Sequence, residues 1–468
     1  MKEEEKSLVK NTVIILISKF CTQFLSFFIL PILTSILTPK EYGTFDLITT
    51  YSWLLVPFLS MQLENGIFRY LIDFRKQKAK QSEIISSGIA AGLIQVLLVS
   101  VIFIILNYVF DIDNAKYIYI ISLSTIILNF PLQISRGFGD NITYAISSIF
   151  VGVINIIICA FTVWYLRLGI FGMVIATVIA NVIGGLYAIL KLKLYYYIKI
   201  KNISKNKVVA LSKYSFPLVP NSISSWIISI SDKVMISLYL GAAANGIYSI
   251  ATKFSILLSH FYSVFNLSWT ESASVNVNSN RKEDFFSNSI NTIFKFCSCI
   301  CLIVLALMPV IFKIMINKTY NQAYQYIPLL ILGSIFEILA GLLSAVYISL
   351  KFSKNIAIST LVTGLINIII NLFFLKHGGI WVACLSTLIS YILLSLYRII
   401  DLKKYLNLQI DYKYIIILLT MYSISTYFYH FNSIIISLFL TTIILVFSII
   451  INKKIIKMIL KKINIIKS

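Results

Sequence analysis

Apolar runs long enough to cross a lipid bilayer recur along almost the whole chain. From Leu8 nearly to the C-terminus, stretches of about 20 apolar residues alternate with short polar breaks. A soluble domain has roughly 45–50% apolar residues, whereas 59% of these 468 residues are hydrophobic and only 12% are charged. The pattern predicts an all-α membrane protein with no segment left for a separate soluble domain.

Glycine, proline, asparagine and charge clusters divide the chain into about fourteen transmembrane spans. The first half contains spans near residues 9–37, 43–71, 83–107, 116–138, 141–166 and 169–195. The second half contains spans near 213–240, 244–272, 284–312, 325–350, 354–375, 379–403, 412–430 and 432–452. The predicted domains are an N-lobe (1–198), a basic cytoplasmic linker (199–212), a C-lobe (213–404), and two extra spans with a basic tail (405–468).

Lysine and arginine concentrate in the connections that follow even-numbered spans. Examples are the segment Arg75 to Lys80 and the linker lysines Lys199 to Lys207, whereas the other connections carry few cations. By the positive-inside rule, the basic loops and both termini face the cytoplasm of a bacterial inner membrane. The net charge of +22 therefore reflects orientation in the membrane, and we expect membrane lipids rather than nucleic acid as partners.

Two parts of the chain resemble each other. Gly43-Thr44-Phe45 and its following residues match Gly246-Ile247-Tyr248, and Gly152 to Ile158 match Gly364 to Ile370. Gly169, Thr177 and Tyr187 likewise match Gly379, Thr387 and Tyr397. Because each copy has an even number of spans, the copies should have the same orientation. We therefore expect two pseudo-symmetric six-helix lobes around a central cavity, with two extra C-terminal helices.

Several ionisable residues lie inside the predicted spans, where each costs about 2.5–3.5 kcal/mol on insertion scales. Cations outnumber anions, and the excess favours a ligand that carries phosphate, to which arginine offers a fork and lysine a point charge. The candidate substrate-binding residues are Lys19, Arg69, Arg136, Lys233 and Lys253. The candidate cavity residues or ion-pair partners are Glu64, Asp232, Glu271, Lys295 and Glu337.

Depth in the membrane suggests two pairs, Lys19 with Glu64 and Lys295 with Glu337. The competing interpretation of the whole set is structural, because buried ion pairs can hold helices in register. For Arg136, a loop cation that obeys the positive-inside rule is an equally good interpretation.

Some segments resemble a known family. Leu37-Thr38-Pro39-Lys40-Glu41-Tyr42-Gly43, Gln62-Leu63-Glu64 and Phe68-Arg69-Tyr70 are similar to the start of Wzx-type polysaccharide-biosynthesis flippases, and Tyr214 to Pro220 with Ser231-Asp232-Lys233 resembles their second lobe. The resemblance implies the multidrug/oligosaccharidyl-lipid/polysaccharide exporter fold. It also implies flipping of undecaprenyl-pyrophosphate-linked oligosaccharide for O-antigen, capsule or another glycan. Lys233 stands where an arginine is common in that family.

The sequence leaves two other functions open. A cation-coupled drug exporter of the same superfamily would use membrane carboxylates, of which Asp46 and Asp232 are candidates. An oligosaccharide polymerase would need a large outer loop, and the predicted outer loops are short. We expect no catalytic residue, metal or cofactor, because no phosphate-binding loop appears and the six cysteines lie in apolar runs. H⁺ or Na⁺ is the expected coupling ion, and polymerase machinery is a candidate partner.

Overall fold

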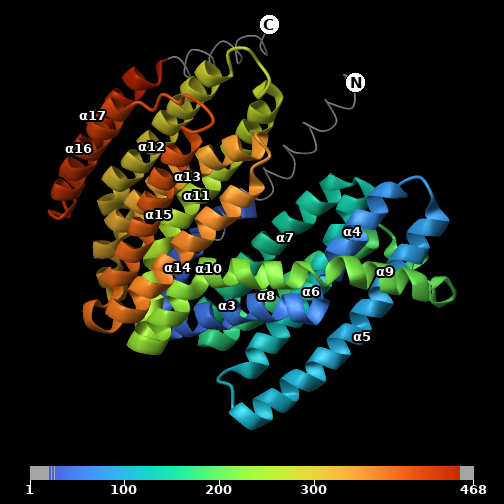
Figure 1. Ribbon diagram of the computed structural model, residues 1–468. Helices are drawn as coiled ribbons and strands as arrows, with labels where there is room; N and C mark the ends of the chain where they lie inside the picture. Colours follow the sequence, from blue (N-terminus) through green and yellow to red (C-terminus); the bar gives the residue numbers. More distant parts are fainter. Residues whose placement is uncertain (1–20, 23, 26, 454–468) are drawn as a thin grey trace, which may run out of the picture. The chain divides into compact units, whose positions relative to one another are not determined.

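The computed structural model describes residues 21–453 apart from residues 23 and 26, and all regular structure in this part of the chain is helical. Figure 1 shows the helices in colours that follow the sequence from blue to red. The chain divides into two compact units, unit 1 (Met1–Val234) and unit 2 (Met235–Ser468), and the boundary falls inside α10. Residues 9–20, 23 and 26 of the predicted first span lie outside the described residues, as does most of the basic tail.

The helices of unit 1 are α2 (Leu30–Ile36), α3 (Pro39–Ser60), α4 (Leu63–Asp73), α5 (Lys78–Phe110), α6 (Ala115–Phe138), α7 (Asn141–Cys159) with the π-helix η1 (Ala160–Tyr165), α8 (Gly169–Lys191), the 3-10 turns η2 (Leu194–Tyr196) and η3 (Ile200–Asn202), and α9 (Lys205–Ser215). α10 (Leu218–Leu240) follows. Those of unit 2 are α11 (Ala242–Asn276), α12 (Lys282–Met315), the 3-10 turn η4 (Lys318–Tyr320), α13 (Asn321–Ser349), α14 (Ser353–Gly378), α15 (Ile380–Leu402), α16 (Tyr412–Tyr429) and α17 (Ile434–Ile451).

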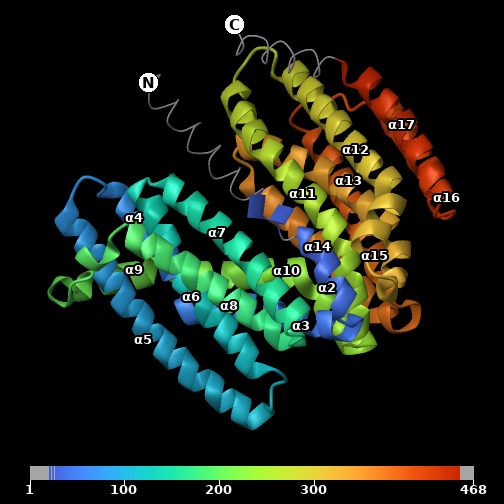
Figure 2. The same cartoon turned by 180° about the vertical axis from the view of Figure 1, so that it is seen from behind.

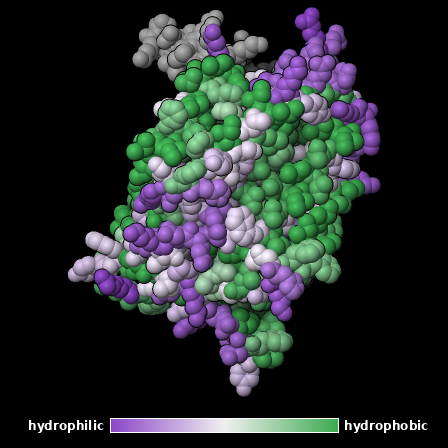
Figure 3. All heavy atoms as spheres, turned by 90° about the vertical axis from the view of Figure 1, so that its left-hand side faces the viewer, coloured by the Kyte–Doolittle hydropathy of each residue, from purple (hydrophilic) through white to green (hydrophobic). Residues whose placement is uncertain are grey.

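Within the described residues, nine helical segments are long and apolar enough to cross a membrane. The helices α3, α10, α11 and α16 also have 18 residues or more but are more polar. Hydrophobic side chains cover a broad continuous area of the face in Figure 3, and hydrophilic ones gather in patches. On α17, for example, Ile435 is 81% exposed and Phe439 is 65% exposed. A surface of this kind is stable only in lipid, so the protein is a multi-pass membrane protein.

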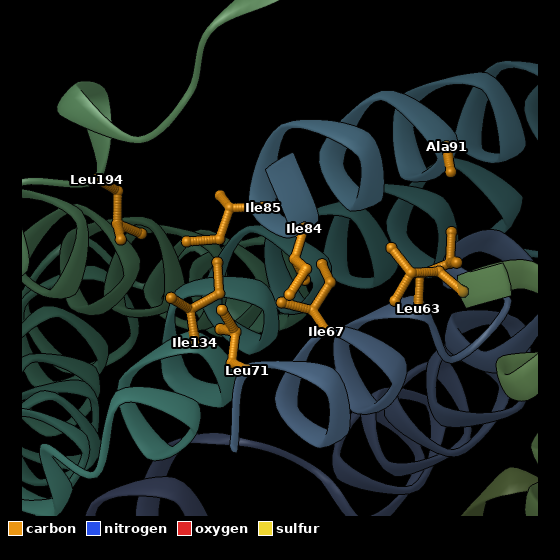
Figure 4. Close-up of a cluster of buried hydrophobic side chains, with 9 residues drawn as sticks. Leu63, Ile67, Leu71, Ile84, Ile85, Ala91, Ile134 and Leu194 are labelled. Carbon is orange, nitrogen blue, oxygen red and sulfur yellow. The ribbon is translucent and has the colours of Figure 1, made fainter. Parts of the chain in front are cut away.

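The core of unit 1 lies where α4, α5 and α6 meet. Figure 4 shows the apolar side chains of this core from these helices, together with Leu194 from the linker after α8. Leu63, Ile67 and Leu71 lie one turn apart along α4 and are fully buried. One face of α4 is therefore fixed against the core, and this fixes the direction of its polar residues.

The second span is a broken helix, although the sequence predicted one continuous span at 43–71. Met61 and Gln62 separate α3 from α4, and both have left-handed backbone angles (φ +49° and +56°). The break is half-buried at Met61 and Gln62, and the adjoining Leu59, Ser60 and Leu63 have at most 1% exposure. Irregular backbone at membrane depth is tolerated only in protein or beside a cavity, and broken helices often mark transport sites.

The two units share one packing pattern. In unit 1, α3 and α4 pack on α6, α6 packs on α8, and α7 packs on α8. In unit 2, α11 packs on α13, α13 on α15, and α14 on α15. The glycines that the repeat aligned have similar positions, since Gly169 is the first residue of α8, Gly379 directly precedes α15, and both have a positive φ (+57° and +62°). A left-handed turn of this kind favours glycine.

Matched asparagines link α7 to α8 in unit 1 and α14 to α15 in unit 2. Asn155 of α7 donates to the hydroxyl of Thr177 in α8 at 3.5 Å. Asn367 of α14 donates to the hydroxyl of Thr387 in α15 at 3.4 Å. Both pairs occupy positions that the sequence repeat aligned, so the duplicated sequence corresponds to duplicated structure.

The linker after α8 is attached to α5 by serine hydroxyls. Ser82 and Ser86 donate to the carbonyl oxygen of Tyr197 at 2.6 and 3.0 Å. Ser87 accepts the backbone N–H of Ser204 at 2.9 Å. The segment between α8 and α9 therefore lies along α5, and α9, which begins at Lys205 inside the predicted linker, packs on the same helix.

The segment after α15 is attached to α12 in the corresponding way. Four polar side chains at intervals of one turn hold it: Glu283, Ser287, Asn291 and Lys295. The backbone N–H groups of Asn407, Gln409 and Asp411 donate to the first three, each at 3.0 Å. Lys295 donates to Asp411, and this hydrogen bond holds the pKa of that carboxyl below its usual value. We call residues 403–411 the strap; α16 begins just after it and packs on α12 beside α17 (Figure 2).

Asn291→Ala is expected to loosen the strap. Asn291 accepts from Asp411 and donates to the carbonyl oxygen of Gln409 at 2.7 Å. Loss of two hydrogen bonds should lower stability by about 1–3 kcal/mol, measurable as a lower midpoint of thermal aggregation in detergent. Asn407→Ala is the matched control, because only its backbone takes part in the strap. Equal midpoints for the two variants would contradict this account of the strap.

Candidate substrate site

Arg136 lies between aromatic rings contributed by two other helices of unit 1. Its guanidinium carbon is 4.6 Å from the ring centre of Phe68 on α4 and 5.8 Å from that of Tyr144 on α7. One Nη donates to the side-chain oxygen of Gln133 at 3.0 Å. No carboxylate of the described residues lies within ion-pair distance of Arg136. The rings hold the plane of the guanidinium, and most of its five donors remain available to a ligand.

The turn between α6 and α7 brings Arg136 and Tyr144 together. Gly139 ends α6 in a left-handed conformation (φ +84°), and its N–H donates to the carbonyl oxygen of Arg136 at 2.9 Å. Asp140 then caps α7 by accepting the N–H of Thr143 at 3.0 Å. Because Arg136 lies in the last turn of α6, the helix dipole also favours a cation there.

A second arginine lies beside Arg136. Arg75 donates from Nε to the carbonyl oxygen of Gly137 at 2.9 Å and lies beside the same helix end. Arg69 forms an exposed ion pair with Asp73 at 2.8 Å. We call Arg75, Arg136 and the side chains that contact Arg136 (Phe68, Gln133 and Tyr144) the arginine cluster. The sequence predicted Arg69 and Arg136 here but assigned Arg75 only to a basic loop.

Lys233 is held in an ion pair. Its Nζ lies 2.9 Å from Oδ1 of Asp46 on α3, and the two side chains are 19% and 10% exposed. Two turns earlier on α10, Trp226 donates to the carbonyl oxygen of Thr50 at 2.9 Å. This part of α10 is therefore attached to α3 at two points, which supports the structural interpretation of Lys233. Its role in substrate binding stays a prediction.

Glu64 is the most buried ionisable residue among the candidates. It lies in the first turn of α4, directly after the helix break, and is 4% exposed. Within the described part of the chain, its Oε2 has no hydrogen-bond partner. Lys19, its predicted partner, lies outside the described residues.

The predicted pair of Lys295 with Glu337 is wrong. Lys295 bonds to Asp411 of the strap, and Glu337 accepts a hydrogen bond from Ser259 of α11 at 2.6 Å. Both residues lie well inside their helices, but they lie on helix faces that contact different neighbours. Lys295 lies on the face of α12 that holds the strap, whereas Glu337 faces α11. The depth of Lys295 and Glu337 in the membrane therefore did not determine their hydrogen-bond partners.

The other three candidates lie on α10 and α11. Lys253 lies in α11 and Asp232 in α10, both with partly buried side chains. Glu271 lies near the end of α11 and is exposed. Their roles in binding stay predictions.

Comparisons with known proteins identify the family to which this chain belongs. Residues 8–270, more than half of the chain, match the family described as polysaccharide biosynthesis protein. The chain belongs to this polysaccharide biosynthesis protein family. Succinoglycan biosynthesis transport protein ExoT of Rhizobium meliloti (strain 1021) is 26% identical over 266 residues, or 53% of this chain and 50% of ExoT. The match thus spans about half the length of this curated relative.

Solved structures show the same fold as this family member. The lipid II flippase MurJ in an inward closed conformation has a TM-score of 0.66 at 17% identity, with 95% of this chain and 100% of MurJ covered. An inward-facing multidrug resistance MATE family transporter of the MOP superfamily has a TM-score of 0.66 at 14% identity, with 82% and 95% covered. The chain therefore has the same fold as these two transporters.

One segment that suggested this family has a clear structural role. Thr38 and Glu41 form a capping box at the start of α3, in which the N–H of Glu41 donates to Thr38 at 3.3 Å and the N–H of Thr38 donates to Glu41 at 2.9 Å. Pro39 occupies the first helical position, where a missing N–H costs nothing. This part of the family pattern specifies a helix start.

Sequence reasoning missed a buried arginine in unit 2 of this family member. Arg398 of α15 is 3% exposed. It donates to the carbonyl oxygen of Ala340 and to the hydroxyls of Ser344, Ser359 and Thr360. Nε also donates to Ser359, so all five donors have acceptors. Its position near the end of a predicted span, among charged loop residues, hid it in the sequence.

Proposed function

We propose that the protein moves undecaprenyl-pyrophosphate-linked oligosaccharide from the cytoplasmic to the outer leaflet by alternating access. The single observation that carries the proposal is Arg136, a cation that no described carboxylate neutralises and that two aromatic rings orient. A pyrophosphate can accept two parallel hydrogen bonds from such a fork. The family match and the fold support a transporter in polysaccharide synthesis.

The basic loops support the direction of transport. Arg75 and Arg136 lie at the end of α6 that the positive-inside rule assigns to the cytoplasm, the side on which lipid-linked sugars are made. Asp73 is paired with Arg69 and Asp140 caps α7, so neither carboxylate forms an ion pair with Arg75 or Arg136 in the described part of the chain. The prenyl tail would remain in lipid while the pyrophosphate binds the arginine cluster.

Export of cationic drugs fits the described residues less well. A drug exporter needs negative charge at its binding site to attract a cationic cargo, whereas the arginine cluster is positively charged. Asp46, one of the two candidates in the sequence, is paired with Lys233. A polymerase is also disfavoured, because connections such as residues 111–114 and 166–168 on the side assigned outward are only a few residues long.

Glu64 is the residue that we propose for the coupling ion, H⁺ or Na⁺. An ionisable side chain inside a membrane span is a functional candidate by default, and this one has a carboxyl oxygen without a described partner. Its position directly after the break between α3 and α4 places it where a span can change shape.

A deletion strain tests the proposed function. We expect loss of the gene to reduce the amount of surface polysaccharide at least tenfold. The amount of lipid-linked oligosaccharide on the cytoplasmic side should increase, because synthesis continues while transport stops. Sugar composition of the cell surface and mass spectrometry of extracted lipids measure the two effects, and a plasmid copy is the control. Normal polysaccharide together with increased sensitivity to ethidium would instead support drug export.

A further inference from the structure

An uncharged cavity, open to the surface, lies between α11 and α12, wholly within unit 2. Its volume is about 410 Å³, inside the range of roughly 300–1,000 Å³ for small-molecule sites. The aromatic residues Phe265, Trp269 and Phe285 contribute to its wall, and none of the described residues that line it is charged. The cavity is separate from the arginine cluster, which belongs to unit 1.

Five polar side chains that line the cavity lack hydrogen-bond partners within the described residues. They are Ser268, Ser272, Asn288, Ser289 and Thr292. Nearby hydroxyls on the same α11 helix behave differently, because Thr270 and Ser274 each donate to the carbonyl oxygen one turn back at 2.8 Å. Ser268, Ser272 and Asn288 are exposed, whereas Ser289 and Thr292 are half-buried. The five side chains are therefore open to water and to a ligand with many hydroxyls.

The aromatic part of the wall is rigid. Trp269 is 3% exposed, and its indole N–H donates to the carbonyl oxygen of Leu342 at 3.0 Å. Its ring stacks on Phe285 with 6.0 Å between ring centres. Phe285 and Phe265 are partly exposed and present their rings to the cavity.

This combination has the chemistry of a sugar site. The C–H face of a sugar ring packs on aromatic rings, and its hydroxyls need side chains that both donate and accept, such as Ser, Thr and Asn. A phosphate would need a cation in the wall, which the lining residues do not supply.

We propose that the cavity binds a neutral sugar ring of the lipid-linked oligosaccharide. The inference rests on the proposed function and adds a separate subsite for the glycan. Ser272 lies one turn before the end of α11 at Asn276, and α12 begins at Lys282 beside Arg281. The positive-inside rule assigns this basic end to the cytoplasm, where the glycan is collected.

Binding measurements in lipid nanodiscs test the proposal with two probes. One is undecaprenyl pyrophosphate without sugar, and the other is the oligosaccharide-bearing form extracted from the deletion strain. Ser272→Ala combined with Asn288→Ala should weaken binding of the oligosaccharide-bearing form about tenfold, as expected for two lost hydrogen bonds. Binding of the sugar-free lipid should not change. Thr292→Val is a second variant of nearly the same shape, and Ser274→Ala is the matched control outside the cavity.

The outcomes separate this proposal from the proposed function. If the wild-type protein binds neither lipid, both proposals are wrong. If it prefers the oligosaccharide-bearing form and the cavity variants keep that preference, the function stands and the cavity proposal is wrong. Equal binding of both lipids by the wild-type protein would also overturn the sugar site.

Discussion

Arg136→Ala is expected to weaken binding of undecaprenyl pyrophosphate about 10- to 100-fold and to reduce surface polysaccharide strongly. Hydrogen bonds to charged groups contribute about 1.5–3 kcal/mol, which corresponds to that range. Arg136 has one described side-chain acceptor, Gln133, so its other donors are the ones a phosphate would occupy. Arg136→Lys should give an intermediate result, because lysine keeps the charge but loses the fork. Nanodisc binding and complementation of the deletion strain measure the two effects.

Lys116→Ala is the matched control for Arg136. Lys116 lies at the opposite end of α6, and its Nζ is 5.0 Å from the ring centre of Tyr117, so the change also removes a cation over an aromatic ring. We expect normal binding and normal polysaccharide for this variant. Full activity of Arg136→Ala at normal protein levels would remove the arginine cluster from the transport mechanism.

Asp46→Ala is expected to destabilise unit 1 by about 3–5 kcal/mol, the usual cost of breaking a buried ion pair. The change leaves the ammonium group of Lys233 without its carboxylate at a position where both side chains are largely buried. The measurement is the midpoint of thermal aggregation in detergent, followed by size-exclusion chromatography. Asp46→Leu combined with Lys233→Met should recover most of the loss, because replacing both charges removes the unpaired one.

The single change Lys233→Met distinguishes the two roles considered for this lysine. A structural ion pair predicts a loss of stability close to that of Asp46→Ala. Wild-type stability together with lost transport would contradict the structural interpretation and would instead support direct binding of substrate by Lys233.

The periodic features of the fold could be predicted from the sequence. Apolar runs of bilayer length gave most helices to within a few residues, because lipid requires every backbone group to be paired within the span. The repeat was visible because Gly169 and Gly379 need the same turn and Asn155 and Asn367 make the same bond.

Features that depend on tertiary contacts could not be predicted. The break at Met61–Gln62 has neither glycine nor proline at its two left-handed residues. The packing around the break stabilises a backbone conformation that the local sequence does not indicate. The partner of Lys295 in the candidate site could not be predicted either. The depth of a residue in the membrane can be counted along its helix, but the partner of Lys295 depends on which neighbouring segment its face of α12 contacts. Arg136 was recognised as a candidate, but its aromatic neighbours on α4 and α7 come from the fold alone.

The most direct measurement uses purified protein in liposomes loaded with undecaprenyl-pyrophosphate-linked oligosaccharide in both leaflets. A glycosidase added outside releases only the sugar that it can reach. The account predicts that the protein raises the released fraction from about one half, the share of one leaflet in two, to nearly all, and that Arg136→Ala stays near one half. Release that stays at one half with the wild-type protein, while the same liposomes transport ethidium, would contradict the proposed function.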